Sequence, residues 1–224
     1  MNNIKRVMSI GAHSLDAELL GGPLVIKYAN LGAKCTFVHV TQGRLEDPNA
    51  TKEENDLYLK KLVSQNENAA KGMSADCNAL GYLSRELPTE SEFIKILVKY
   101  FTEEKVDLII THYSGTLHPR HYYTYYTVTE AVKICRQNGM NIKLLYGENC
   151  EDLVGFIPQA YYELSEEELN IWFNALKSYE IFNGKINNVP YNDYYKTMGK
   201  VRSLECGSRK FTKAYMYASL IENI

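Results

Sequence analysis

The chain has 224 residues, long enough to bury a substantial core, and its 45% hydrophobic and 23% charged residues are typical of a folded globular protein. A formal net charge of −2 offers no basic surface for nucleic acid or anionic lipid, and no apolar run is long enough to span a membrane. The five cysteines form no C-x-x-C pair, which favours reduced thiols in a cytoplasmic protein over a disulfide framework.

Apolar strand patterns and amphipathic helix patterns alternate along the chain. In chain order they predict a strand over 6–10, a helix over 16–30, a strand over 34–40, a helix over 51–71, a short strand over 78–83, a helix over 91–103, a strand over 106–111, a helix over 123–138, strands over 142–146 and 161–164, and helices over 165–182 and 191–204. This alternation predicts a mostly parallel sheet covered on both faces, an α/β class. No linker or repeat divides the chain, so residues 1–224 are expected to form one domain.

Four of the five histidines follow predicted strands. His13 comes after the first strand, His112 directly after the strand over 106–111, and His118 and His121 in the loop beyond it. In parallel sheets of this kind, ligands bind at the carboxyl ends of the strands, so these four histidines are candidates for a site. His39 lies inside a strand and is interpreted as a structural residue.

The spacing of the charged and imidazole groups points to a metal. His13 and Asp16 share one strand-to-helix turn, and His118 and His121 share another. Zn²⁺ accepts such a mixture of imidazole nitrogen and carboxylate oxygen, and three protein ligands leave a position for water, which the metal can acidify. The spacing alone allows a second interpretation, in which Asp16 caps the following helix and the two later histidines are ordinary loop residues.

Other catalytic motifs are absent from the sequence. It contains no P-loop, no G-x-G-x-x-G after the first strand, no G-x-S-x-G and no H-E-x-x-H. Gly21 and Gly22 lie within the first predicted helix, where they favour close helix packing over ligand approach.

Several of these segments together resemble a known family. The run VMSIGAHSLDAE over 7–18, the Gly21-Gly22 pair, the strand end at 38–43 and His118-Pro-Arg-His121 are similar, in order and spacing, to the LmbE-like or PIG-L family of zinc-dependent N-acetylglucosaminyl deacetylases. The resemblance covers roughly the first two-thirds of the chain, whereas 195–218 is only loosely similar.

The resemblance implies a Rossmann-like α/β three-layer sandwich that removes an acetyl group from an N-acetylated sugar or glycoconjugate. It implies that His13, Asp16 and His121 are the Zn²⁺ ligands, and that His118 stabilises the oxyanion or protonates the leaving amine. Members of the family often form homo-oligomers, and nothing in the sequence specifies which.

The departures from the family motifs concern proton transfer and charge. The family's motif A-H-P-D-D-E has its general base where this chain has Leu15, and H-P-D-H has an Asp where this chain has Arg120. Arg120, if it faces the site, would bind a carboxylate or phosphate of the substrate. Glu18 is the nearest carboxylate in sequence, although a first-turn glutamate more often complements the helix dipole. Glu67 matches the Glu of a further family motif whose Arg is missing.

Three functions therefore remain open on the sequence. The first is a metal-dependent deacetylase, and the second is a catalytically impaired relative that binds a metal or a sugar-like ligand without turnover. The third, a glycosyltransferase, has no D-x-D motif to support it. Substrate selectivity is expected from the loops over 42–50 and 83–90.

Overall fold

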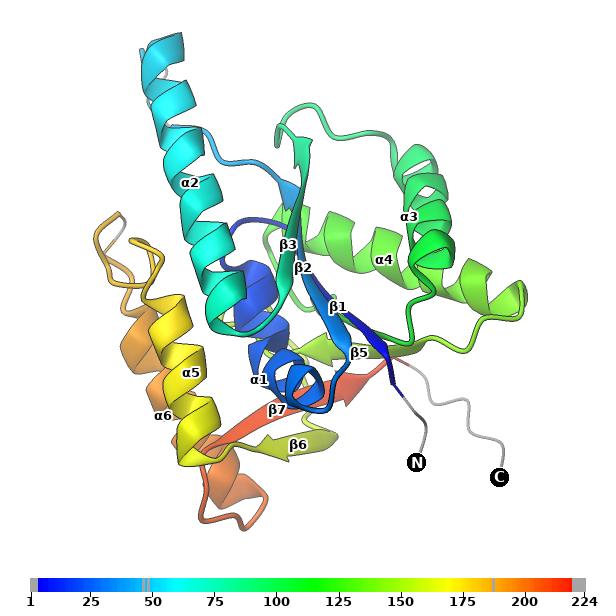
Figure 1. Cartoon of the computed structure of the whole chain (residues 1–224), viewed down its shortest axis with the longest axis vertical. Coiled ribbons are helices and arrows are strands. Elements are labelled where there is room, and N and C mark those ends of the chain that lie inside the picture. Colours follow the sequence, from blue (N-terminus) through cyan, green and yellow to red (C-terminus); the bar gives the residue numbers. More distant parts are fainter. Residues whose placement is uncertain (1–3, 46, 48, 187, 219–224) are drawn as a thin grey trace.

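The computed structural model describes residues 4–45, 47, 49–186 and 188–218. Its centre is one seven-stranded sheet with the strand order β3-β2-β1-β4-β5-β7-β6 (Figure 1). The strands are β1 (Arg6–Gly11), β2 (Lys34–Thr41), β3 (Asp76–Tyr82), β4 (Leu108–Thr111), β5 (Lys143–Gly147), β6 (Ala160–Glu163) and β7 (Thr212–Tyr217). β1 to β5 pair in parallel, and β7 runs antiparallel between β5 and β6. The predicted α/β class with a mostly parallel sheet is confirmed.

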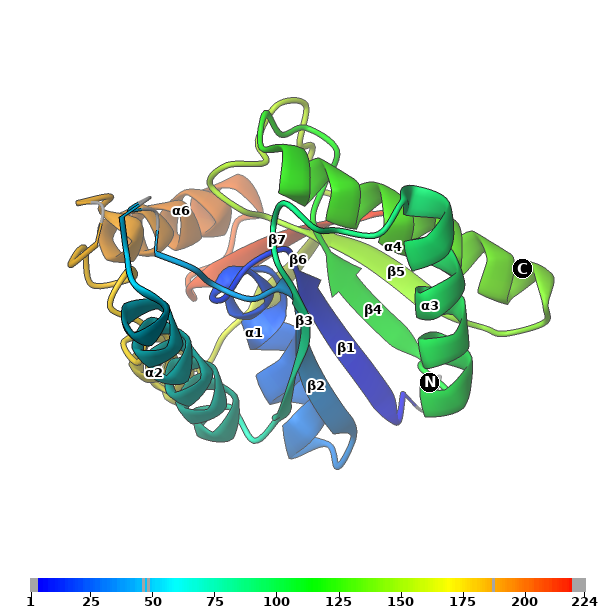
Figure 2. The ribbon, with the colours of Figure 1, turned by 90° about the horizontal axis from the view of Figure 1, so that it is seen from above.

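Helices cover both faces of the sheet (Figure 2). They are α1 (Asp16–Asn30), α2 (Lys52–Gly72), α3 (Glu90–Glu104), α4 (Pro119–Gln137), α5 (Glu166–Leu176) and α6 (Tyr191–Glu205). α1, α2 and α5 pack over one face around buried residues such as Phe37 and Trp172, and α3 and α4 pack over the other around Phe93 and Phe101. Because the middle of the sheet is covered on both sides, β1, β2 and β4 are almost entirely buried, whereas the edge strand β3 is only partly buried.

The chain reverses its direction of travel across the sheet between β1 and β4. From β1 it proceeds through β2 to β3 on one side, and it then returns to place β4 and β5 on the other side of β1. Such a switch point leaves a crevice beyond the carboxyl ends of the two adjacent strands, where ligands bind in open α/β sheets. The segments after β1 and β4, which carry the predicted site histidines, meet at this crevice.

The glycine pair in α1 allows close packing, as the sequence predicted. A Cβ atom on Gly21 would lie 2.3 Å from Ser9 Oγ, and one on Gly22 would lie 2.5 Å from Trp172 Nε1. Real Cβ atoms do not approach other heavy atoms so closely, so the two glycines let α1 lie directly against β1 and α5. Trp172 Nε1 in turn donates a hydrogen bond of 3.0 Å to the carbonyl of Glu18.

The largest differences from the prediction concern α4, α5 and β7. α4 begins at Pro119, four residues earlier than expected, because proline suits the first helical position, where no N–H partner is needed. The prediction of a loop for His121 was therefore wrong, since His121 lies in the first turn of α4. α5 ends at Leu176 instead of continuing to 182, and β7 was not predicted. Among the described residues, no helix is long and apolar enough to cross a membrane.

Candidate metal centre

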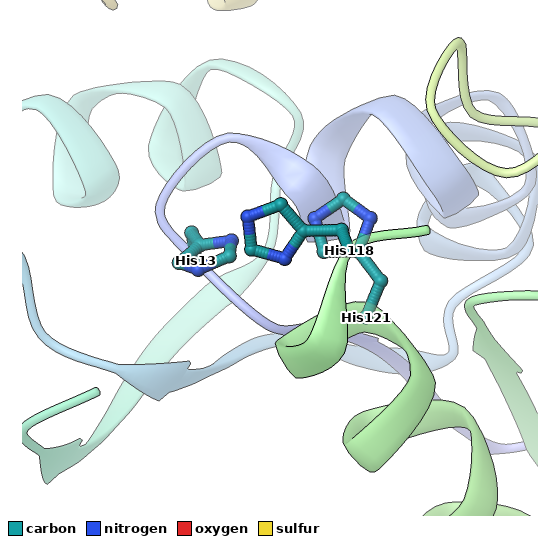
Figure 3. Close-up of side chains that lie close together, drawn as sticks. All are labelled: His13, His118 and His121. Atoms are coloured by element: carbon teal, nitrogen blue, oxygen red, sulfur yellow. The ribbon is translucent and has the colours of Figure 1, made fainter. Parts of the chain in front are cut away.

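Three of the predicted site histidines lie together at the switch point (Figure 3). His13 follows β1, whereas His118 is the N-cap of α4 and His121 lies one turn further on. The ring centroids of His118 and His121 are 4.4 Å apart, and that of His13 lies 4.9 Å from the first and 5.3 Å from the second. Two turns that are about a hundred residues apart in sequence therefore converge.

Asp16 joins this group through a single carboxylate oxygen. Its Oδ2 accepts hydrogen bonds from the backbone N–H of His13 at 2.8 Å and from His13 Nδ1 at 3.0 Å, and lies 3.3 Å from His121 Nε2. Asp16 is the first residue of α1, and the N-cap position belongs to Leu15, which makes no side-chain capping bond. The alternative in which Asp16 serves only as a helix cap is therefore wrong.

A buried aspartate that the sequence analysis missed orients the imidazoles. Asp152, fully buried in the loop after β5, accepts from His112 Nδ1 at 2.6 Å and from His121 Nδ1 at 2.8 Å. His112 also accepts the Ala12 N–H at its Nε2, 3.0 Å away, so both of its ring nitrogens are engaged. His112 is thus a structural residue, whereas His121 is left with Nε2 facing Asp16.

The donor set fits a zinc ion. Ligand atoms from His13, His118 and His121 lie within 4.8 Å of one another, and so do those of Asp16, His112 and His121, although both ring nitrogens of His112 are already engaged. Asp16 Oδ2 links the two groups, because it lies 3.0 Å from His13 Nδ1 and 3.3 Å from His121 Nε2. Two ligands of a tetrahedral zinc ion, each roughly 2.0–2.1 Å from it, lie roughly 3.3 Å apart, close to the spacing of Asp16 Oδ2 from its imidazole neighbours. A carboxylate that holds the remote nitrogen of a ligating histidine, as Asp152 holds His121, is the usual support for such a ligand.

The electrostatics of the site favour a cation at its centre. Burial opposes charge on His121, but Asp16 and Asp152 outweigh it and raise the pKa of this imidazole to about 10. Burial likewise opposes ionisation of Asp16, yet the imidazoles of His121, His112 and His13 hold its pKa well below the usual value. With Glu151 Oε2 only 3.7 Å from His121 Nε2, three carboxylates surround one ring. This arrangement concentrates negative potential where a divalent ion would bind.

Two further side chains lie beside this cluster: His118 at the start of α4 and Glu151 in the loop after β5. Burial and the neighbouring His121 and His13 lower the pKa of His118 to about 4, so its ring is neutral near pH 7. Its Nδ1 is buried without a hydrogen-bond partner among the described residues. Glu151, in the loop after β5, is 47% exposed at its side chain, and burial of the rest raises its pKa.

The position of the family's general base is apolar and strained. Leu15 is 3% exposed, packs with the hydrophobic core beneath α1 and adopts φ of 82°, a conformation that favours glycine. Such strain, about 1–3 kcal/mol, is typical of functional sites. Glu18, the nearest carboxylate in sequence, is fully buried and bound to His39 and Tyr179. Glu67 is exposed on α2.

A cavity of about 800 Å³ opens over the site. Its wall includes His13, Asp16 and His118 and, among the described residues, parts of the two loops over 42–50 and 83–90 from which selectivity was expected. Residues 46 and 48 of the first loop lie outside the described part of the chain. Arg120 lines the cavity as well.

Three residues of the loop after β5, Asn149, Glu151 and Asp152, belong to the site but were not predicted. The signal for them was available, because they follow a predicted strand in the same way as the histidines do. The loop over 148–159 contains no histidine, so the histidine spacing gives no sign of it.

The family model for PIG-L, described as GlcNAc-PI de-N-acetylase, matches residues 8–132, more than half of the chain. The chain belongs to the PIG-L family. No curated protein matches the chain significantly. The matched PIG-L segment runs from β1 through most of α4 and so includes the three predicted ligands.

Solved structures resemble this PIG-L family protein over nearly its whole length. The 4-carboxy-2-hydroxymuconate hydratase GalB from Pseudomonas putida aligns with a TM-score of 0.79 at 12% identity, covering 99% of this chain and 100% of that one. The N,N′-diacetylchitobiose deacetylase from Pyrococcus horikoshii gives 0.74 at 15% identity, covering 95% and 83%. A deacetylase of teicoplanin biosynthesis gives 0.71 at 14% identity, covering 96% and 99%. At these identities the likeness establishes the fold alone.

Proposed function

We propose that this PIG-L family protein is a zinc-dependent hydrolase that removes an acetyl group from an N-acetylated sugar or glycoconjugate in the cytoplasm. The observation that carries the proposal is that Asp16 Oδ2 lies 3.0 Å from His13 Nδ1 and 3.3 Å from His121 Nε2 at the switch of the sheet, with Asp152 bound to the other nitrogen of His121. Structural neighbours described as deacetylases, including one for diacetylchitobiose, support the substrate class.

His13, Asp16 and His121 would hold the metal. When bound, zinc supplies Lewis-acid chemistry, polarising a carbonyl and making water more acidic. Asp152 keeps the proton of His121 on Nδ1 and so directs Nε2 toward the ion. His118, neutral and with an unpartnered nitrogen at the cavity wall, hydrogen-bonds the reacting acyl group or the leaving nitrogen.

Glu151 is the proton acceptor of the proposed reaction. Its Oε2 lies 3.7 Å from His121 Nε2 and its side chain lines the cavity, whereas Leu15 has no group that can accept a proton. The carboxylate takes a proton from the attacking water and can return it to the departing amine. Glu151 therefore approaches the site from the loop after β5, in place of the residue that other family members carry after β1.

Two measurements test the proposal. Protein purified without a His-tag should contain stoichiometric zinc by elemental analysis, and His121→Ala should lose it. Fluorescamine should detect amine released from N-acetylglucosamine and N,N′-diacetylchitobiose, and His13→Ala should release none. Zinc must be titrated, since one structural neighbour is the zinc-inhibited form of a teicoplanin deacetylase. Zinc without turnover on any N-acetyl sugar would favour the non-catalytic alternative.

A second function is favoured by the charge of the cavity rim. Arg44, Arg85 and Arg120 line the cavity beside Asp47 and Glu86, and none of these arginines has an ion-pair partner among the described residues. Guanidinium groups bind carboxylates in a bidentate manner. Together with the fold shared with GalB, the rim supports a metal-dependent hydratase of a small unsaturated carboxylate.

The two functions are separable in one experiment. The zinc-loaded protein is offered N-acetyl sugars and, separately, unsaturated di- and tricarboxylates whose conjugated double bond absorbs ultraviolet light. Release of amine supports the deacetylase. Loss of absorbance that requires zinc, with no amine released from any sugar, supports the hydratase and overturns the deacetylase.

A further inference from the structure

Asn149 is a buried amide at the wall of the cavity that the proposed reaction has not used. It follows β5 by two residues, is 1% exposed and lines the same cavity as His118 and Glu151. Buried amides are normally satisfied at both ends. Among the described residues, the amide oxygen of Asn149 has a hydrogen-bond partner and its amide nitrogen has none.

The orientation of this amide is fixed by the backbone. The N–H of Glu151 donates to Asn149 Oδ1 at 3.1 Å, and because a backbone N–H can only donate, the carbonyl oxygen must face it. The amide nitrogen Nδ2 then occupies the other position, where it has no hydrogen-bond partner among the described residues. A residue that lines the cavity therefore holds a buried neutral donor without an acceptor among the described residues.

Several hydrogen bonds hold the loop that carries Asn149. Arg202 Nη2 bonds Glu148 Oε1 at 2.6 Å, and Lys213 donates to the Glu148 carbonyl. The Tyr195 hydroxyl accepts the Cys150 N–H at 3.3 Å. The backbone carbonyl of Asn149 accepts a hydrogen bond of 3.0 Å from the N–H of Asp152. These contacts fix the backbone on both sides of Asn149, and a fixed orientation is the property that makes preorganised donors effective.

We propose that Asn149 Nδ2 donates a hydrogen bond to the acyl oxygen of the substrate. The inference rests on the proposed hydrolase function and names a substrate-contacting residue within it. Glu151, two residues away on the same loop, lies beside His121, so the loop that carries Asn149 also carries the proposed proton acceptor. As the carbonyl becomes tetrahedral, negative charge moves onto that oxygen, and the amide N–H stabilises it.

The variant Asn149→Asp tests the donor with little change in shape. The carboxylate keeps an oxygen for the Glu151 N–H but has no N–H to offer the substrate. Loss of one such donor lowers kcat by about 10²–10³-fold, and we expect that fall with little change in KM or zinc content. Asn66→Asp is the matched control, since Asn66 is a buried asparagine on α2 outside the cavity lining, and its kcat should stay at the wild-type value.

Two results would overturn the inference. One is an unchanged kcat in Asn149→Asp, and the other is a rise in KM alone, which would assign the amide to ground-state binding. Absence of turnover in the wild-type protein is a different outcome, because it contradicts the hydrolase proposal itself.

A spectroscopic readout tests Asn149 independently of turnover. In the zinc-loaded, ¹⁵N-labelled protein, the side-chain NH₂ signals of Asn149 are identified by their loss in Asn149→Asp. Titration with acetate, the product of the proposed reaction, should move these signals, because a carboxylate oxygen takes the place of the acyl oxygen. Signals that stay in place at saturating acetate overturn the inference. The NH₂ signals of Asn66 should not move in either case.

Discussion

At the scale of single residues, the site consists of a ligand group and the side chains that orient it. Asp152 is the most consequential of the latter, because its carboxylate accepts hydrogen bonds from both His112 and His121. The carboxylate offers each Nδ1–H donor its own oxygen, Oδ2 for His112 and Oδ1 for His121, whereas an amide would place an NH₂ group opposite one of the two rings.

The variant Asp152→Asn should therefore weaken zinc binding. One of the two imidazoles would face an NH₂ group and lose its orientation, and we expect the affinity for zinc to fall about 10–100-fold. Competition with a chromophoric chelator measures it. Asp107→Asn is the control, because Asp107 accepts from the backbone N–H groups of Lys5 and Arg6, away from the site, and zinc affinity should not change. Equal affinity in Asp152→Asn and wild type would contradict this role.

Glu151, the proposed proton acceptor, should determine the rate of the chemical step. Glu151→Gln keeps the size of the side chain but removes the base, and we expect kcat for acetyl release to fall about 10²–10⁴-fold. Glu67→Gln, an exposed change on α2, should leave kcat unaltered. Adding Leu15→Asp to Glu151→Gln places a carboxylate where the family has its base, and should recover part of the activity. Full activity in Glu151→Gln would exclude this residue as the base.

At the scale of elements, a buried ion pair fastens α1 to β2 beneath the site. Both carboxylate oxygens of Glu18 lie 3.1 Å from His39 Nε2, and the Tyr179 hydroxyl donates to the same carboxylate at 2.9 Å. The interpretation of His39 as structural is in keeping with this contact. Since α1 begins at Asp16, the pair also holds the turn that carries a proposed ligand.

The stability that this pair provides should depend on pH. Burial opposes charge on His39, but Glu18 raises the pKa of His39 to about 10, above its ordinary value of 6.5. A raised pKa means that the contribution is complete below pH 6.5 and is lost as the pH rises toward 10. His39→Gln should lower the free energy of unfolding by about 3–5 kcal/mol at pH 6 and by much less at pH 10. Urea unfolding of both proteins at the two pH values measures the difference. A difference that is constant with pH would contradict the ion pair.

The sequence predicted most elements because apolar periodicity and glycine stops determine them locally. α1 has the predicted bounds, 16–30, since its apolar face and the following Gly32 are both visible in the sequence. β7 was missed because an antiparallel strand inserted between β5 and β6 depends on partners that local pattern does not reveal. The proposed ligands follow from the resemblance to the family motifs. Asp152 also follows a predicted strand, but local sequence pattern does not reveal that β5 lies beside β4 and so brings Asp152 to the histidines.

At the scale of the whole molecule, the site is assembled from both parts of the chain. The segment 8–132 that matches the family model supplies the proposed ligands and His118. The remainder supplies Asp152, Glu151 and Asn149, and α6 and β7 hold their loop through Arg202 and Lys213. The C-terminal region is therefore part of the site, although its sequence is only loosely similar to the family.

Arg120 in the cavity lining is expected to contribute to substrate selectivity. Arg120 lies at the start of α4, one residue from His121, and faces the cavity without an ion-pair partner among the described residues. If it binds an anionic group of the substrate, Arg120→Met should raise KM for N-acetylglucosamine 6-phosphate about 10-fold or more, since a hydrogen bond to a charged group contributes about 1.5–3 kcal/mol. KM for uncharged N-acetylglucosamine should stay nearly constant.

Ionic strength separates a direct contact from a general charge effect. The wild-type preference for the phosphorylated sugar should weaken as salt screens the exposed rim, while Arg120→Met should show little preference at any salt concentration. Lys200→Met, an exposed change on α6 outside the cavity lining, controls for net charge and should behave as the wild type. Equal KM ratios in wild type and Arg120→Met would mean that Arg120 does not contact the substrate, and selectivity would then rest with the loops over 42–50 and 83–90.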